Sequence, residues 1–440
     1  MATEKDLTKG SIRSHLIALS IPASMGMLFD TLYNLTDNWF AGKVSDTALV
    51  GLSIASVVFL LLIAITIGLQ SGTSAVIAPD YSKRDQTAVK QWVNNAFGIG
   101  LLMSIVVLIT GLLYSPALLD ILSDDSAAKT EAWRYLIVII IGNAAYAITS
   151  VCAGTLMAMG NTTSFRNVLV IGFFANWILN PLLTFYFGLG ITGLALATLI
   201  IKLASAFYLM FVVKRKIGIM PRPSFQWLRW KETLQQVLPA SFNFLTIIIG
   251  GFIIVAFIGR FGSNAVAGYS VALRIEQMLL MPALGLNAAV MALVGQNYGA
   301  NLTDRIRQTY RRSLQLGFYV SLICIPLMIF ASPYMMGLFT NNQEIIDIGT
   351  LYLRADAVAF FAYVIIFTCV AVLQAIKQPN FPMVIGIIRQ LILPVAVNYV
   401  LIVMLGYPVA ALFWSIVMIV IFSALLMLWY TQRQLNRMSV

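Results

Sequence analysis

Apolar runs longer than about 18 residues follow one another along the whole chain, separated by short polar segments. A run of this length can cross a lipid bilayer as an α-helix. The runs are continuous, whereas the strands of a membrane β-barrel alternate between apolar and polar residues. We therefore predict an all-α integral membrane protein. Its twelve expected transmembrane helices are 14–42, 46–77, 91–115, 132–158, 164–187, 191–213, 234–260, 264–296, 313–337, 348–376, 381–405 and 408–431.

The distribution of charge predicts the topology. Only 10% of the 440 residues are charged, against about 25% in soluble proteins, and the net charge is +11. If both termini are cytoplasmic, most lysines and arginines fall in inside segments, which follows the positive-inside rule. We expect a multi-pass protein of the bacterial inner membrane with cytoplasmic N and C termini. Its basic balance then reflects topology and anionic membrane lipids, and no nucleic acid partner is expected.

The chain contains an internal repeat. Pro22 and Gly68 recur as Pro239 and Gly285 at the same spacing, and several other glycines, alanines and serines match at this constant offset. Each half holds six predicted helices and starts on the same side, so the repeats are parallel. The predicted organisation is an N-terminal six-helix lobe (1–213), a cytoplasmic linker (214–233) and a C-terminal six-helix lobe (234–440).

The first apolar run contains two carboxylates, Asp30 and Asp37, with Asn34 between them. The spacing from Asp30 to Asp37 is almost two helical turns, so we expect the three side chains to share one face. A carboxylate at membrane depth is costly and usually marks an ion or proton pathway. Because burial favours the neutral form of a carboxyl group, Asp37 is predicted to bind the proton of an ion-coupled transporter.

Three strings resemble the multidrug and toxic compound extrusion (MATE) family, and the resemblance covers essentially the whole chain. They are Leu32-Tyr33-Asn34-Leu35-Thr36-Asp37, Asn176-Trp-Ile-Leu-Asn180-Pro181 followed by Gly188 to Thr198, and Val294-Gly295-Gln296-Asn297-Tyr298-Gly299-Ala300. The resemblance implies twelve helices in two pseudo-symmetric six-helix lobes. An acid in helix one, with none in residues 240–258, is similar to the DinF branch and to its Vibrio exporters.

The resemblance also implies a function and a site. Members of this family export flat, cationic or amphipathic drugs by alternating access in exchange for H⁺ or Na⁺. The family pattern places Asn176, Asn180 and Thr198 around Asp37, although asparagine and threonine also commonly join membrane helices without any such role. Many relatives carry an acid at the position of Asn180. Its loss leaves one fewer anionic ligand for a hard cation, which favours coupling to H⁺ over Na⁺.

Other polar residues within the apolar runs have more than one interpretation. Pro22 either kinks helix one for gating or only shapes the core. Asp30 is a second titrating group, a contact for a cationic drug or a structural acid. In the C-terminal lobe, the charged residues either pair internally or form a second coupling site. The expected cavity-lining residues are Asp30, Tyr33, Asn34, Asn143 and Tyr146, and the C-terminal candidates are Arg274, Glu276 and Asp356, with Arg354 and Arg389 nearby.

Alternatives to a proton-coupled drug exporter are a Na⁺-coupled antiporter and a lipid-linked sugar flippase of a related fold. A membrane enzyme would need a catalytic histidine constellation, and the only histidine is His15. No cofactor and no metal site are expected. One chain contains both lobes, so we expect a monomer whose partners are small-molecule drugs, H⁺ or Na⁺, and membrane lipids.

Overall fold

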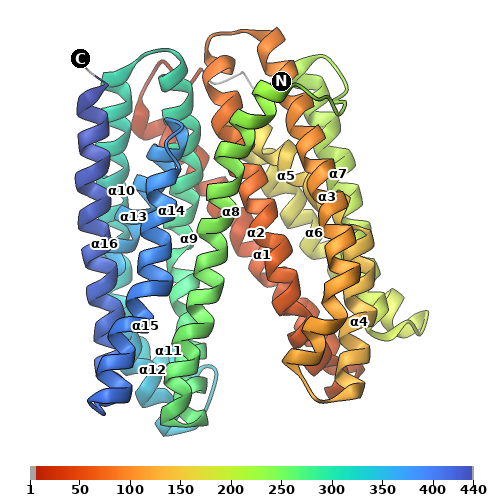
Figure 1. Cartoon of the computed structure of the whole chain (residues 1–440), viewed down its shortest axis with the longest axis vertical. Coiled ribbons are helices and arrows are strands. Elements are labelled where there is room, and N and C mark those ends of the chain that lie inside the picture. The colour runs from red at the N-terminus through yellow and green to blue at the C-terminus, as the bar shows by residue number, and fades with distance from the viewer. Residues whose placement is uncertain (1–5, 439–440) are drawn as a thin grey trace. The chain divides into compact units, whose positions relative to one another are not determined.

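The computed structural model describes residues 6–438, which contain helices and no strand (Figure 1). Ten helices in this part of the chain are long and apolar enough to cross a membrane. Two pairs of shorter helices, each bent at a break, bring the number of possible spans to twelve. These spans follow the predicted ones in order. The prediction of an all-α, multi-pass membrane protein is confirmed.

The first half of the chain contains seven α-helices and one π-helical segment. They are α1 (Ile12–Val44), α2 (Asp46–Ser82), α3 (Gln86–Leu122), α4 (Ser126–Ile141), α5 (Asn143–Ala158), α6 (Thr163–Pro181), η1 (Leu182–Tyr186) and α7 (Gly190–Ile217). The second half repeats the order with more interruptions. Its elements are α8 (Trp227–Ile258), η2 (Gly259–Phe261), α9 (Ser263–Gly299), α10 (Thr303–Phe330), α11 (Ser332–Gly337), α12 (Gln343–Asp356), α13 (Phe360–Ala375), α14 (Asn380–Ile387), η3 (Ile388–Ile392), α15 (Leu393–Asn398), η4 (Tyr399–Met404) and α16 (Val409–Arg437).

The fourth predicted span of each half is broken in its middle. The helices α4 and α5 meet at Gly142 with a bend of 52°, and α12 and α13 meet with a bend of 56°. The two breaks occupy equivalent positions of the repeat, since Ala359 is the repeat counterpart of Gly142. Both spans were predicted as continuous helices, 132–158 and 348–376. Each of these spans is apolar enough over its whole length to be predicted as one helix, and neither break contains a proline.

The chain packs as two compact units, residues 25–241 and residues 1–24 with 242–440. The unit boundaries fall inside α1 and α8, two residues after Pro22 and Pro239. Proline lacks a backbone N–H and so removes one hydrogen bond from each helix interior. Because the boundaries fall there, the first part of α1 and of α8 belongs to one unit and the rest of the same helix belongs to the other. The lobes predicted from the repeat, 1–213 and 234–440, remain a proposal.

Close backbone approach fixes the first parts of α1 and α8 within their units. A Cβ at Gly285 would lie 2.6 Å from the carbonyl oxygen of Ser20 and would overlap the hydroxyl of Ser24. The repeat counterpart is Gly68, where a Cβ would lie 2.7 Å from the carbonyl oxygen of Val237. Each glycine thus lets two helices touch through their backbones, as small residues do between membrane helices.

We expect Gly285→Ala to destabilise the protein by about 1–3 kcal/mol, because the added methyl group has no space beside the α1 backbone. Thermal unfolding of the purified protein in detergent measures the effect. Gly251→Ala is the matched control, since a Cβ at this position in α8 meets nothing within 4 Å. Equal melting temperatures for the two variants would contradict the close-packing explanation.

The connection between α7 and α8 is fastened to α3. Its irregular part is 218–226, shorter than the predicted linker 214–233, because α7 and α8 both extend into the predicted range. The backbone N–H of Ser224 donates to the carbonyl oxygen of Asn94 at 3.1 Å, and that of Gln226 donates to Asn95 Oδ1 at 2.8 Å. The linker is therefore an ordered part of the unit formed by residues 25–241.

Candidate functional site

Asp37 is buried in the unit formed by residues 25–241, with 5% of its surface exposed. Three side chains donate hydrogen bonds to its carboxylate. Asn176 and Asn180 donate through Nδ2 to Oδ1 at 2.8 and 2.9 Å, and Thr198 donates to Oδ2 at 3.3 Å. The structure thus brings together α1, α6 and α7 around one carboxylate.

Helical spacing explains how these side chains meet. Asn176 and Asn180 are i,i+4 neighbours on α6, so both face α1, and Asn180 also donates to Asn176 Oδ1 at 3.0 Å. Tyr33 is i,i+4 with Asp37 on α1, and its hydroxyl donates to Thr198 Oγ1 at 2.9 Å. The π-helical segment η1 begins two residues after Asn180. Such segments often occur at functional sites in helices.

One acceptor beside Asp37 has no partner. Asn180 Oδ1 is buried and makes no hydrogen bond in the described structure. A charged Asp37 only accepts hydrogen bonds, and the three donors satisfy it. A protonated Asp37 would instead need an acceptor for its O–H, and a rotation of the Asn180 amide would present one. The arrangement can therefore hydrogen-bond either protonation state.

The residues expected to share a face of α1 with Asp37 lie in different environments. Asn34 is exposed, and its side chain donates to the backbone carbonyl of Asp30 at 2.7 Å. Asp30 is partly exposed. Three residues make less than one full helical turn, which moves Asn34 off the Asp37 face. Tyr33, predicted as a cavity-lining residue, is buried and belongs to the Asp37 network.

The two predicted cavity-lining residues of α5 are buried close to the break between α4 and α5. Asn143 donates to the carbonyl oxygen of Ile140 at 2.6 Å and lines a cavity of about 10 Å³. That volume is about enough for one water molecule. Tyr146 is also buried, and its hydroxyl has no hydrogen-bond partner in the described residues.

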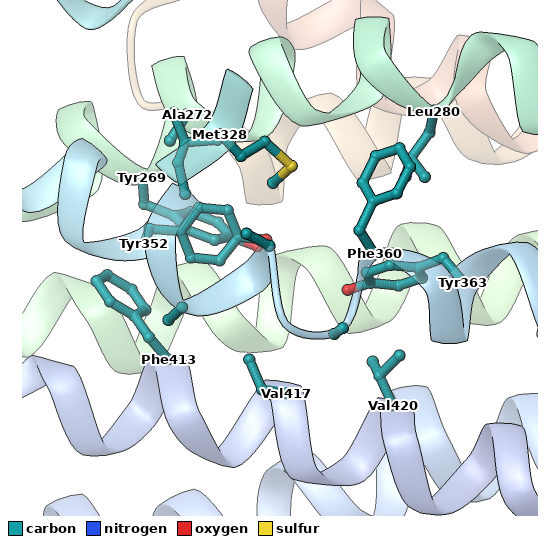
Figure 2. Packing of buried hydrophobic residues seen from close by; sticks show 14 of the residues in the cluster. Tyr269, Ala272, Leu280, Met328, Tyr352, Phe360, Tyr363, Phe413, Val417 and Val420 are labelled. Atoms are coloured by element: carbon teal, nitrogen blue, oxygen red, sulfur yellow. The ribbon is translucent and has the colours of Figure 1, made fainter. Parts of the chain in front are cut away.

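A second group of buried carboxylates lies in the other unit. Tyr352 donates to Glu276 Oε2 at 2.6 Å, and Tyr363 donates to Asp356 Oδ1 at 3.2 Å. Asp356 is the last residue of α12, and Figure 2 shows Tyr352 and Tyr363 on the two sides of the break before α13. The bond to Tyr363 therefore bridges the break.

The expected internal ion pairs of this second group are not direct contacts. Within residues 6–438, no salt bridge joins Arg274, Glu276, Asp356 or Arg389 to one another. Arg274 is exposed, whereas Arg389 is buried and its Nε has no hydrogen-bond partner. The two carboxylates instead accept hydrogen bonds from tyrosine hydroxyls. The same part of the chain contains no cluster of three or more His, Cys, Asp or Glu side chains placed to hold a metal ion.

The two units keep part of a common polar framework. Tyr135 and Tyr146 of the broken fourth span recur at the repeat spacing as Tyr352 and Tyr363. Asn398 and Ser415, the counterparts of Asn180 and Thr198, are hydrogen-bonded to each other at 2.8 Å. Ile254 occupies the position equivalent to Asp37. The framework is therefore duplicated, whereas a carboxylate at the Asp37 position is found only in the first half.

A comparison with protein families matches the MatE model to residues 22–182 and again to residues 239–400. The chain belongs to the MatE family. The two matches begin at Pro22 and Pro239, the prolines from which the repeat was inferred, so the internal duplication is confirmed. The second match is slightly longer than the first, which accounts for the small shift of Asn398 from the repeat position of Asn180.

Several relatives resemble this MatE protein over most of their length. The FAD transporter of Shewanella oneidensis is 24% identical over 405 residues, which are 89% of each chain. The probable multidrug resistance protein NorM of Thermotoga maritima is 25% identical over 388 residues, 86% of this chain and 83% of the relative. A solved structure of an outward-facing multidrug resistance MATE family transporter has a TM-score of 0.93 at 22% identity, covering 100% and 99% of the two chains. It has the same fold.

Two residues of this MatE protein near Asp37 were missed by the sequence analysis, Lys202 on α7 and Tyr135 on α4. Lys202 interacts electrostatically with the Asp37 carboxylate, and Tyr135 lies within hydrogen-bonding reach of Thr198. The sequence did indicate Lys202, because a lone lysine near the middle of an apolar run is as unfavourable in free energy as an acid at that depth. It did not indicate Tyr135, since tyrosine is common in membrane helices.

Proposed function

We propose that this protein exports amphipathic drugs across the bacterial inner membrane in exchange for H⁺, with both termini cytoplasmic. We place it in the DinF branch of the family, because α8 carries no acid within residues 240–258. Asp37 is the proposed proton-binding residue, and Asn176, Asn180 and Thr198 are its hydrogen-bonding partners.

The observation that carries this proposal is the buried carboxylate of Asp37, which has donors for its charged form and an unpartnered acceptor beside it. A structural acid needs partners for one protonation state only. A group that loads and releases a proton in each cycle needs partners for both, because an unsatisfied buried polar atom costs about 1–3 kcal/mol.

Proton binding also has a route to act on the rest of the protein. Asp37 lies on the part of α1 that belongs to residues 25–241, and the part before Met25 belongs to the other unit. We propose that protonation exchanges the hydrogen bonds of Asp37 and changes the conformation of α1 near Pro22. A drug that binds one of the two resulting states more tightly is then exchanged for the proton.

Drug export is supported by the names of the relatives, which include a multidrug export protein of Staphylococcus aureus and a probable multidrug resistance protein of Thermotoga maritima. The FAD transporter of Shewanella oneidensis is named for a different compound, so similar chains differ in what they carry. A Na⁺-coupled antiporter and a lipid-linked sugar flippase are the alternatives.

Reconstituted wild-type protein tests the coupling ion. We expect a fluorescent cationic dye to be moved when a pH gradient alone is imposed across the liposome membrane. A Na⁺ gradient at equal pH is expected to move no more dye than protein-free liposomes do. Dye movement driven only by Na⁺ would reject proton coupling. Movement of lipid analogues, but of no dye, would favour the flippase.

A further inference from the structure

Lys202 lies deep in a membrane-spanning helix. It is 12 residues from the start of α7 and 15 from its end, or about 18 and 22 Å along the helix axis. The hydrocarbon core of a bilayer is about 30 Å thick, so Lys202 lies near its middle. A lysine side chain is too short to reach either interface from this depth, and lipid headgroups do not solvate it.

The side chain of Lys202 turns away from the apolar face of α7. Ile200, Leu203 and Phe207 are 42–65% exposed and occupy one side of the helix. Lys202 is i,i+4 with Thr198, which is buried against Asp37, so it points toward the polar side of the unit. It is nevertheless partly exposed. Lys202 is therefore accessible on a face of α7 other than the apolar one.

The ammonium group of Lys202 makes no hydrogen bond and no salt bridge in the described structure. It lies over the ring of Tyr146, whose centroid is 5.3 Å from Nζ. Asp37 acts on it only at longer range, and the carboxylate of Asp37 is hydrogen-bonded to Asn176, Asn180 and Thr198. A charge at this depth normally faces the bundle interior or a water-filled cavity and pairs with another group. Among the described residues Lys202 has no such pair, so its ammonium group is free to bind an anionic ligand.

Tyr146 supplies an independent sign that a ligand group is missing. It is 5% exposed, and its hydroxyl is a buried donor without any hydrogen-bond partner among the described residues. The ring that carries this hydroxyl also holds the ammonium of Lys202. Two unused donors on neighbouring side chains suit an oxyanion such as a carboxylate.

Asp30 provides the opposite charge nearby. It is partly exposed, its carboxylate makes no hydrogen bond in the described part of the chain, and it belongs to the same unit as Tyr146. We propose that Lys202 and Tyr146 bind the carboxylate of a zwitterionic amphipathic substrate, while Asp30 binds its cationic group. This inference rests on the proposed export function and names the substrate class.

A carboxylated rhodamine and its methyl ester test the proposal, because they share the cationic ring system and differ only in the carboxylate. Binding of each dye to purified protein is measured by fluorescence anisotropy. We expect Lys202→Met to weaken binding of the carboxylated dye about tenfold, the effect of losing one charge-assisted hydrogen bond, and to leave the ester unchanged. Asp30→Asn is expected to weaken both dyes equally, and Lys202→Arg to keep the preference for the carboxylate.

An equal effect of Lys202→Met on both dyes, or no effect on either, would overturn the proposal. Lys202→Gln serves the same purpose if the Met variant does not fold, as judged by its melting temperature. The export function is tested separately by dye transport in liposomes. Selective binding without transport under any gradient would reject the export function and keep the substrate site, whereas transport with an unselective Lys202→Met variant would reject only the site.

Discussion

Asp37→Asn is expected to reduce export driven by a pH gradient to the level of protein-free liposomes. Asparagine has the size of aspartate, and its one oxygen can accept the hydrogen bonds that Asn176 and Asn180 donate to Oδ1, so the fold should be retained. It cannot gain or lose a proton, and this removes the exchanged ion from the cycle. Dye transport in liposomes measures the loss, and dye binding to the purified variant shows that the drug site survives.

Asp356→Asn is the matched control for this variant. Asp356 is also a buried carboxylate within a helical span, but it lies in the other unit and bonds to Tyr363. We expect it to keep transport driven by the pH gradient. Loss of transport in Asp356→Asn together with normal transport in Asp37→Asn would move the coupling site to Glu276 and Asp356.

Asn180→Leu should have the second largest effect on coupling. Leucine has the same branched arrangement of side-chain heavy atoms, but it removes a donor to charged Asp37 and the unpartnered acceptor beside it. A hydrogen bond to a charged group contributes about 1.5–3 kcal/mol, so we expect a transport rate at least about tenfold lower under a pH gradient. Initial rates in liposomes, measured at equal protein content, quantify this decrease.

The internal repeat offers a control for the cost of losing a buried asparagine. Asn398 is the counterpart of Asn180 and bonds to Ser415, with no carboxylate at the position equivalent to Asp37. We expect Asn398→Leu to lower the free energy of unfolding by about as much as Asn180→Leu does. Its proton-driven transport rate should stay close to that of the wild type. If both leucine variants transport equally slowly, the role of Asn180 is structural.

Hydropathy predicted the twelve spans because lipid imposes long apolar helices on any sequence that crosses it. The repeat was predicted from identical residues that recur at a constant offset. Hydropathy did not predict the breaks at Gly142 and before Phe360, because it measures how apolar the side chains are and not the direction of the helix axis. The π-helical segments were missed for the same reason. The side chains of η1 and η4 are as apolar as those of the neighbouring turns, whereas η3 contains Arg389 and Gln390.

The site was predictable where a residue type is rare at membrane depth. Asp37 stood out for this reason, and only the family resemblance added Asn176, Asn180 and Thr198. Spacing alone placed Asn34 on the Asp37 face, whereas the packing of α1 buries Asp37 and leaves Asn34 exposed, and its role as a cavity-lining residue stays a prediction. Lys202 was overlooked because the basic residues were counted for topology and not for depth.

The exchange of the first parts of α1 and α8 between the two units has a consequence for the origin of the fold. Gly68 accepts the backbone of α8, and Gly285 accepts the backbone of α1, so each half covers a helix surface of the other. A protein made of a single repeat would leave that surface bare. It could cover it only by pairing with a second copy that lends its own first half-helix. We infer that gene duplication fused an intertwined dimer of this kind into one chain.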